Sequence, residues 1–503
     1  MPDRPVGSQW LKEHYELSDY ILTHSSYIGS PESIELTSRG CVEQVYTVRY
    51  APAQDTPLLH LEFSLKYDDL NLDFLSAVFE KLPMADLIAY IESSPSGRYT
   101  RRIGYLYEFL TGRQLVIATP IAGNYVELLD PEKYITGNTI KNARWHINDN
   151  LLGSRSFCPM VRKTRTLVEL LNQSIPGQIE QLKRSISEAT FRRAVINYLY
   201  NKETRSSYEI ERESPSPDRI EKFIGLLATA GTEPDNRLLE EHRLVQLQNS
   251  IVDSRFADST FRNFQNYIGQ SLPHNQQLVH YVCPPPSFVY SLMNGLGDTA
   301  TKTSGIYPEV RAAIIAFGFV FIHPFEDGNG RLHRFLIHDI LVHDGAVPQG
   351  LIIPVSAHML SNMREYDGVL EKYSKPLMQR IRYDMNDLCE LLVTNEGKVE
   401  NYFRYPDLTD QCIYLAQTIH ATLEHDMPDE LQLIQRYDEA KRVLQNVVDM
   451  PDKDLNLMIT FLHQNNGIFP KRRRERFAKL SDEEIDHMQK KFREIFELKD
   501  VDK

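Results

Sequence analysis

The stretch that decides the fold of this chain reads Ile322-His323-Pro324-Phe325-Glu326-Asp327-Gly328-Asn329-Gly330-Arg331-Leu332-His333-Arg334. On its N-terminal side, apolar residues recur every three to four positions from Pro308 to Phe321, which predicts a buried helix. Pro324 is poorly tolerated inside a helix, so this helix is expected to end near His323. Apolar spacing resumes from Arg331 to Val342 and predicts a second helix that begins near Gly330. The stretch is therefore expected to form a loop between two core helices.

The residue types in this loop are those of an anion-binding site. Gly328, Asn329 and Gly330 can adopt positive φ, which lets successive amide N–H groups converge on one point. That point lies at a helix N-terminus, where unpaired N–H groups and the helix dipole favour an anion. Arg331 and Arg334 are three residues apart, so they lie on one face of the first turn, and their planar donor forks match phosphate oxygens.

Two further side chains give the loop its chemistry. Asp327 is a hard oxygen ligand of the kind that Mg²⁺ accepts beside substrate phosphates. His323 can exchange a proton near neutral pH without a large pKa shift. A base, a metal carboxylate, an anion site and two arginines within one loop predict nucleotidyl or phosphoryl transfer.

The string from His323 to Arg334 resembles the signature HPFx[DE]GNGRxxR of the Fic family at every specified position. The resemblance implies an all-helical core and the transfer of AMP from ATP to a Ser, Thr or Tyr hydroxyl of a protein. It implies that His323 is the general base and that Asp327 holds Mg²⁺ between the α- and β-phosphates. It also assigns the phosphate cradle to Gly328, Asn329, Gly330 and Arg331, the γ-phosphate to Arg334, and the anchoring of the loop to Phe325.

A second motif, Ser207-Tyr208-Glu209-Ile210-Glu211, lies N-terminal to the signature in the segment 204–213. It resembles the inhibitory motif [ST]xxxE[GN] of the same family. The resemblance implies that Glu211 pairs with Arg334 and blocks the place of the γ-phosphate. Arg212 departs from the pattern, because the family has Gly or Asn there. A solvated acidic helix end is the alternative interpretation.

Residues 261–269 and 277–286 resemble the flap of the family, an extended pair that precedes a run of prolines. Proline cannot continue a strand ladder, so the edge formed by Val279, His280 and Tyr281 is expected to stay open. An open edge can pair with an extended segment of a target protein through main-chain hydrogen bonds. An ordinary surface hairpin is the alternative.

The composition is that of a globular protein with 42% hydrophobic and 25% charged residues. The 56 basic and 69 acidic residues give a net charge of −13, which argues against wholesale nucleic-acid binding. No apolar run is long enough to span a membrane, and Met1 to Pro5 lacks the apolar core of a signal peptide. Five cysteines without CxxC spacing are expected to be free thiols. These features predict a cytoplasmic protein without a membrane partner.

We therefore predict a mainly α fold with three parts. Residues 1–165 form an N-terminal α+β domain, residues 166–395 the Fic core with its hairpin flap, and residues 396–503 a C-terminal helical domain. Ser481 and Glu484 form a capping box that predicts a last helix through Phe496. In the N-terminal domain, residues 71–110 predict three helices, which could form a helix-turn-helix with Arg98, Arg101 and Arg102 on a basic face. Ordinary helix packing with a solvated basic face is the commoner alternative.

The predicted function is AMP transfer from ATP to a target protein or to the chain itself, with inhibition by Glu211. Gly330 favours this reaction, because family branches that transfer phosphate have Lys at that position. Removal of AMP from a modified protein by the same site is one alternative. A nucleotide-sensing regulator that binds DNA is another, and a homodimer is left open.

Overall fold

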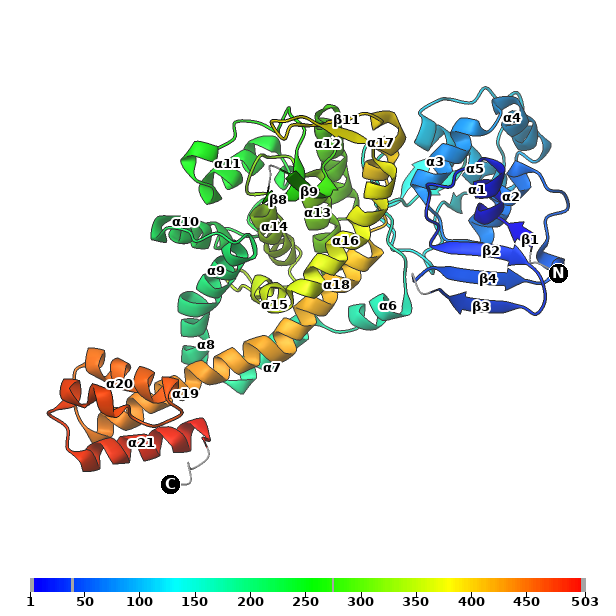
Figure 1. Ribbon diagram of the computed structural model, residues 1–503. Coiled ribbons are helices and arrows are strands. Elements are labelled where there is room, and N and C mark those ends of the chain that lie inside the picture. The colour runs from blue at the N-terminus through cyan, green and yellow to red at the C-terminus, as the bar shows by residue number, and fades with distance from the viewer. Residues whose placement is uncertain (1–3, 38–39, 274–275, 499–503) are drawn as a thin grey trace.

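The computed structural model describes residues 4–37, 40–273 and 276–498, and it is mainly α-helical (Figure 1). An N-terminal unit of helices and strands lies at one end of the molecule, and a small helical bundle lies at the other. A larger group of helices lies between them and contains the signature loop. The predicted fold class, a helical core with a short hairpin and two flanking units, is confirmed.

The N-terminal unit combines a four-stranded sheet with five helices. The sheet has the order β1-β2-β4-β3, with β2 and β4 parallel and the other neighbours antiparallel. A three-stranded sheet of order β5-β7-β6 follows. The elements are β1 (Arg4–Val6), α1 (Ser8–His14), β2 (His24–Ile28), β3 (Ser33–Leu36), β4 (Val42–Tyr46), α2 (Pro57–Tyr67), α3 (Leu72–Lys81), α4 (Met84–Ser93), α5 (Arg98–Thr111), β5 (Val126–Glu127), β6 (Ile140–Asn142) and β7 (Ile147–Asp149).

The central group is helical except for two hairpins. Its elements are α6 (Arg165–Leu171), α7 (Ile175–Ser185), α8 (Glu188–Ala194), α9 (Tyr200–Ile210), α10 (Pro217–Leu227), α11 (Glu241–Ile251), β8 (Tyr267–Leu272), β9 (Gln276–Val282), α12 (Pro286–Lys302), α13 (Pro308–Ile322), α14 (Asn329–His343), α15 (Val355–Ser361), α16 (Met363–Arg380), β10 (Tyr383–Met385), β11 (Leu391–Val393), α17 (Glu396–Arg404) and α18 (Thr409–Ala421). A π-helix, Val195–Leu199, joins α8 to α9.

Helices α13 and α14 form the centre of this group. Every residue of α13 from Glu309 to Ile322 is buried, and α14 packs along it. Both predicted helices are confirmed, with ends within two residues of the expected positions. Burial of α13 on all sides fixes where its C-terminus, and hence the loop, lies in the molecule.

The C-terminal bundle begins with the long helix α19 (Met427–Val447), which leads away from the central group (Figure 1). Helices α20 (Asp452–Gln464) and α21 (Asp482–Phe496) fold back and share a small apolar core with the end of α19. The capping box predicted for Ser481 and Glu484 is confirmed, since each side chain accepts the other's backbone N–H.

The predicted domain boundaries at 165 and 395 remain predictions, and the apolar clusters run across both of them. The central cluster includes Phe157 on one side of its range and extends through Leu415 to Leu431 on the other. The N-terminal cluster includes Tyr405. Packing thus joins α17 and α18 to the central helices.

The three helices predicted between residues 71 and 110 are present as α3, α4 and α5. Arg101 and Arg102, however, are 3% and 5% exposed. Arg101 donates from Nη1 to the carbonyl of Asn124 over 2.7 Å, and Arg102 donates from Nε to that of Glu127 over 2.8 Å. The solvated basic face expected of a DNA-reading helix is therefore wrong for two of its three arginines.

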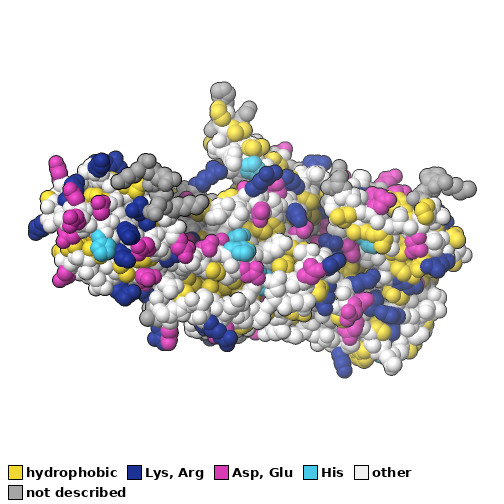
Figure 2. Space-filling view, turned by 90° about the horizontal axis from the view of Figure 1, so that it is seen from below, with side chains coloured by type: hydrophobic (Ala, Val, Ile, Leu, Met, Phe, Trp, Pro, Cys, Tyr) yellow, Lys and Arg dark blue, Asp and Glu magenta, His cyan; other side chains and the backbone are white. Residues whose placement is uncertain are grey.

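The surface of the molecule carries charges of both signs. Acidic and basic side chains are interspersed over the face shown in Figure 2. All five cysteines are free, as predicted. Among the described helices, none combines the length and the apolarity that crossing a bilayer requires.

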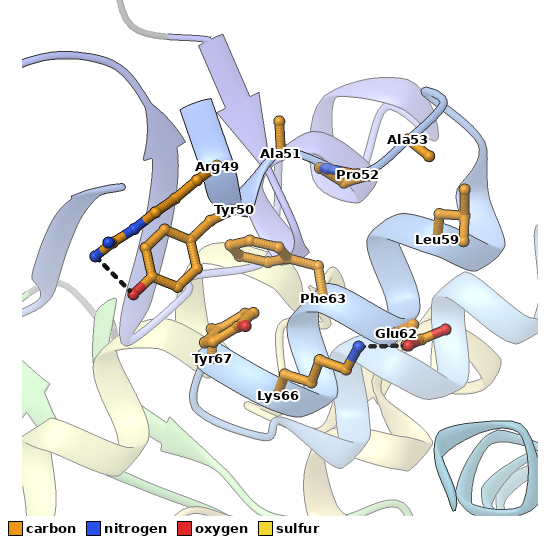
Figure 3. Close-up of a pocket in the computed structure, with 10 residues that line it drawn as sticks. All are labelled: Arg49, Tyr50, Ala51, Pro52, Ala53, Leu59, Glu62, Phe63, Lys66 and Tyr67. Carbon is orange, nitrogen blue, oxygen red and sulfur yellow. Dashed lines mark hydrogen bonds and ion pairs between the residues drawn. The ribbon is translucent and has the colours of Figure 1, made fainter. Parts of the chain in front are cut away.

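A cavity of about 550 Å³ lies in the N-terminal unit beside α2 (Figure 3). Its aromatic walls are Tyr50, Phe63 and Tyr67, and the ring centroids of Phe63 and Tyr67 are 4.7 Å apart. Its lining residues run from Arg49 to Tyr67, so it takes no residue from the signature loop.

The N-terminal unit makes a specific packing prediction at Gly104 in α5. A Cβ added there would lie 2.1 Å from the ring of Trp145, which is fully buried. We expect Gly104→Ala to lower the free energy of unfolding by about 1–3 kcal/mol, as over-packing does in other cores. Urea unfolding followed by Trp fluorescence measures this, because Trp10 and Trp145 both lie in this unit.

Gly225 in α10 is the matched control, since an added Cβ there meets no atom within 4 Å. Gly225→Ala should stabilise its helix by up to about 1 kcal/mol, measured by urea unfolding in far-UV circular dichroism. An unchanged urea midpoint for Gly104→Ala would contradict the close packing of Trp145 on α5.

Candidate active site

The signature loop is held by its own side chains between α13 and α14. Phe325 is fully buried and packs on Phe261 and Phe319. Asn329 brackets the Phe325 backbone, accepting its N–H at Oδ1 over 3.0 Å and donating from Nδ2 to its carbonyl over 2.9 Å. The loop is thus anchored by one aromatic side chain and one amide, and Phe325 lies where the sequence placed it.

Two residues of the loop take left-handed backbone conformations. His323 ends α13 with φ 53°, and Gly328 opens α14 with φ 86°. Glycine adopts this conformation without strain, whereas histidine does so at a cost of roughly 1 kcal/mol that surrounding contacts must offset. The backbone therefore turns sharply at both ends and leaves the first N–H groups of α14 directed into the loop.

Arg262 supplies the contacts that hold this turn. It is 2% exposed and donates from Nε to the carbonyl of His323 over 2.7 Å. Its other guanidinium nitrogens donate to the carbonyls of Phe264 and Pro284, and its own N–H donates to that of Pro324 over 2.8 Å. Sequence reasoning passed over Arg262, because one arginine within the flap motif carries no periodic signal.

His323 is only partly exposed, and its ring is positioned by a backbone carbonyl. Nδ1 lies 3.2 Å from the oxygen of Val320. A neutral ring that donates from Nδ1 leaves Nε2 as the proton acceptor. Burial and the nearby cation of Arg262 lower the pKa of His323 to about 4, against smaller opposing effects of Val320, Glu211 and Asp327. The ring is therefore unprotonated at neutral pH.

Arg331 and Arg334 lie side by side on the first turn of α14, each 1% exposed. Arg334 donates from Nε to Ser207 Oγ and from Nη2 to the Ser207 carbonyl, both over 2.8 Å. Its Nη2 also lies 2.7 Å from Glu211 Oε1. Arg334 Nη1, close to Gly330, is buried without a hydrogen-bond partner among the described residues. An unsatisfied buried donor of this kind suits an anionic ligand.

Glu211 comes to this place from the C-terminal end of α9. Arg212 takes φ 57° and donates its N–H to the carbonyl of Glu209, while Glu213 donates to that of Tyr208. These two hydrogen bonds form a Schellman helix end, which normally has Gly at the position of Arg212. The departure from the family pattern therefore leaves the helix-end geometry intact.

The close approach of Glu211 depends on Gly330. A Cβ at this position would lie 2.1 Å from Glu211 Oε1, so a larger residue would displace the carboxylate. Glu211 thus lies against both Gly330 and Arg334, and Ser207 contacts the same arginine. The structure brings together the residues of two motifs that are more than a hundred positions apart.

Arg331 is also engaged by carboxylates. Its Nη2 lies 2.7 Å from Asp327 Oδ1 and 2.8 Å from Glu213 Oε1, and its Nη1 donates to Glu213 Oε2 over 3.2 Å. Sequence reasoning assigned no role to Glu213. The signal was present, because Glu213 stands two residues after the inhibitory glutamate in the helix-end segment.

Asp327 is the carboxylate expected to hold a metal ion. Its Oδ1 accepts the N–H of Gly328 over 2.6 Å and contacts Arg331, while the side chain is 43% exposed. The described residues contain no group of three or more His, Cys, Asp or Glu side chains that could hold a metal by themselves. Mg²⁺ is commonly bound by one carboxylate, substrate phosphates and water, and an exposed Asp327 fits that mode.

The predicted docking residues lie on β9 of the flap, which pairs antiparallel with β8. His280 is exposed and Val279 is partly buried against the core. Tyr281 is 5% exposed, and its hydroxyl donates to the carbonyl of Phe321. The side chain of Tyr281 therefore faces the core. That of His280 faces the other way, because neighbouring residues of a strand point to opposite faces.

A cleft of about 740 Å³ opens beside the end of α9. Glu213, Ile210 and Arg212 line it from the helix end, and Leu360 and Met363 line it from α15 and α16. The cleft therefore has both apolar and charged walls, and through Glu213 it adjoins one of the carboxylates that contact Arg331.

The sequence is similar to known proteins over the segment that contains the signature loop. A profile of the Fic/DOC family matches residues 238–341, which include the loop and both of its arginines. A curated relative, "Protein adenylyltransferase fic-1" of Caenorhabditis elegans, is 31% identical over 153 residues, 28% of this chain and 27% of the relative. "Protein adenylyltransferase Fic" of Drosophila erecta is 25% identical over 236 residues, 46% of this chain and 39% of the relative. The chain thus spans roughly a quarter to two fifths of the relatives it matches.

Among solved structures, a Fic family protein from Desulfovibrio desulfuricans aligns with a TM-score of 0.35 and 16% identity over 66% of this chain and 87% of that chain. A likeness of this size carries no weight beside the sequence match. The similarity to the Fic/DOC family thus lies in segment 238–341, which contains the signature loop.

Proposed function

We propose that this chain is a protein adenylyltransferase that moves AMP from ATP to a Ser, Thr or Tyr hydroxyl of a target protein or of itself. The observation that carries the proposal is the geometry of one loop. It combines an unprotonated histidine, a helix N-terminus and two buried arginines. The relatives named protein adenylyltransferase support the same reaction.

In the proposed reaction, the hydroxyl oxygen of the target attacks the α-phosphorus of ATP. The bond between the α-phosphorus and its bridging oxygen breaks, and pyrophosphate leaves. Nε2 of His323 takes the hydroxyl proton, because Nδ1 is directed to the Val320 carbonyl. Positioning and electrostatic stabilisation by fixed donors carry most of the rate in phosphate transfers of this kind.

The phosphates would occupy the N-terminus of α14. The backbone of Asn329 and Gly330 would offer N–H groups there, joined by that of Gly328 once Asp327 Oδ1 releases it, and Arg331 and Arg334 would supply the guanidinium donors. Asp327 would hold Mg²⁺, which when bound neutralises the charge of the leaving pyrophosphate. The cleft beside α9 is the proposed place of the nucleoside, because Ile210, Leu360 and Met363 offer it apolar contacts among charged side chains. Glu213 lines this cleft and also contacts Arg331.

We infer that the chain inhibits itself. Glu211 lies on Arg334, the arginine assigned to the γ-phosphate, so ATP must displace a charged hydrogen bond before it binds productively. Ser207 holds Arg334 from the same helix. Glu211 is also the residue that the reverse reaction, removal of AMP, would use, and this reversal is the second candidate activity.

The proposal extends to the target and to location. The open edge of the flap would pair with an extended target segment through the backbone of Val279, His280 and Tyr281. Of these three residues, His280 has the exposed side chain, because Tyr281 is directed inward and Val279 is partly buried. Free cysteines favour the cytoplasm. The burial of Arg101 and Arg102 argues against DNA binding by α5.

Replacing His323 by Ala removes the proposed base. Labelling of proteins with α-labelled ATP should fall by roughly a hundredfold or more, the usual size of a general-base effect. ATP binding, measured by calorimetry, should survive, because His323 makes no proposed phosphate contact. Retention of labelling by His323→Ala would exclude the mechanism.

The pH profile of kcat/KM tests the electrostatic role of Arg262. With the pKa of His323 at about 4, labelling should stay flat down to about pH 5. Arg262 disfavours the imidazolium, so Arg262→Gln should raise the controlling pKa and lower the relative rate at pH 5 by about twofold or more.

Arg262→Lys is the matched variant, because it keeps the cation but loses the fork that reaches several carbonyls. It should keep the acid limb of the parent and lose rate at every pH. An acid limb at the same pH in Arg262→Gln and in the parent would contradict the assignment.

Releasing Arg334 should activate the chain. Because the Glu211 carboxylate is 36% exposed, solvent screening keeps the pair near the low end of the range for charged hydrogen bonds, or roughly tenfold in apparent ATP affinity. Glu211→Gly should therefore raise labelling at sub-saturating ATP by about that factor. Combining it with Arg334→Ala should remove the gain, and Glu221→Gln, which removes an exposed carboxylate of α10, should produce no gain. Equal labelling by the parent and Glu211→Gly would show that α9 is not inhibitory.

A further inference from the structure

The helix end of α9 presents a second carboxylate to the phosphate site. Glu213 contacts Arg331 through both oxygens, with Oε1 2.8 Å from Nη2 and Oε2 3.2 Å from Nη1. This is a two-point pairing of the kind that guanidinium groups form with carboxylates and phosphates. Arg331 is 1% exposed, so a ligand cannot use it from the solvent side without displacing Glu213.

Both carboxylates are positioned by the same backbone device. In the Schellman end of α9, Glu211 is the last residue of the turn and Glu213 follows Arg212, whose φ is 57°. The two side chains are separated by one residue in the left-handed conformation, which directs Glu211 to Arg334 and Glu213 to Arg331. One helix end thus serves both arginines of the signature.

A third arginine holds Glu213 in place. Arg219 of α10 lies 2.8 Å from Glu213 Oε2 and also donates to the carbonyl of Ile251 over 3.0 Å. Arg331 donates to the same carbonyl over 3.2 Å, and the hydroxyl of Tyr208 donates to it over 2.8 Å. Glu213 therefore bridges Arg219 and Arg331, and both of these arginines also donate to the carbonyl of Ile251.

The charges of this cluster balance. Arg219, Arg331 and Arg334 contribute three positive charges, and Glu211, Glu213 and Asp327 contribute three negative charges. A polyphosphate that entered the resting site would meet no net positive charge from these side chains. Removing Glu211 alone frees Arg334 but leaves Arg331 paired with two carboxylates.

We propose that Glu213 closes Arg331 to polyphosphate ligands, so that the end of α9 blocks both arginine positions of the phosphate site. The proposal rests on the proposed function, in which these arginines bind the phosphates of ATP. It adds Glu213, which contacts Arg331, to Glu211, which contacts Arg334. Full opening of the site requires both carboxylates to leave.

The test is calorimetric binding by the full chain, which needs no catalysis. Glu213→Gln should tighten binding of ATP and of inorganic tripolyphosphate by about tenfold, since it replaces a charged pair by a neutral contact. Glu211→Gly with Glu213→Gln should bind both ligands more tightly than either single variant does, because it frees both arginines. Tripolyphosphate places the gain at the phosphate site, because it has no nucleoside.

Two variants serve as controls. Glu221→Gln removes an exposed carboxylate of α10 that does not line the cleft beside α9, and it should leave both affinities unchanged. Arg219→Gln removes the other partner of Glu213 and should not tighten binding, because the carboxylate stays on Arg331. Thermal unfolding of each variant checks that the helix end remains folded.

The outcomes separate this inference from the proposed function. If Glu211→Gly binds ATP more tightly and Glu213→Gln binds both ligands as the parent does, the role of Glu213 is overturned and the function stands. If Arg219→Gln tightens binding as much as Glu213→Gln, Glu213 acts by holding α10 and the inference is also overturned. If no variant binds ATP or tripolyphosphate, both proposals fail together.

Discussion

Two guanidinium groups buried in one place constrain the rest of this structure. Arg331 and Arg334 lie on adjacent positions of the α14 surface and are each 1% exposed. A buried charge is tolerated only with partners that replace its hydration, and an isolated one costs far more than a domain can tolerate. The chain supplies those partners from α9 and from the loop itself. The placement of the α9 end, which lies far away in sequence, follows from this requirement.

The same constraint explains how the proposed phosphate site can be closed by the chain's own side chains. Carboxylates of Glu211, Glu213 and Asp327 satisfy the arginines by the geometry that phosphate oxygens would use. Exchange of one set of oxygens for the other leaves the arginines paired in both states. Nη1 of Arg334 and Nε of Arg331 are buried donors without a hydrogen-bond partner among the described residues, so the chain's own carboxylates leave both unsatisfied.

Much of the central fold followed from local patterns in the sequence. The apolar spacing of α13 and α14, and the proline and glycines between them, predicted both helices and the loop, because these patterns act within a few residues. The capping box at Ser481 was read correctly for the same reason. The N-terminal sheet was largely missed. The sequence predicted an α+β domain there but not the strands or their order, since strand pairing depends on partners distant in sequence.

The sequence by itself determined which residues form the candidate site, because the chemistry of His323, Asp327, Arg331 and Arg334 is written in one contiguous loop. Only the tertiary structure decided how these groups are held. It added Arg262 as the clamp on His323 and Glu213 as the second partner of Arg331, and it turned Tyr281 inward. It also buried Arg101 and Arg102, which local spacing alone had left on a solvated face. The physical reason is that burial, and the pairing of charges that burial demands, are set by contacts between segments far apart in the chain.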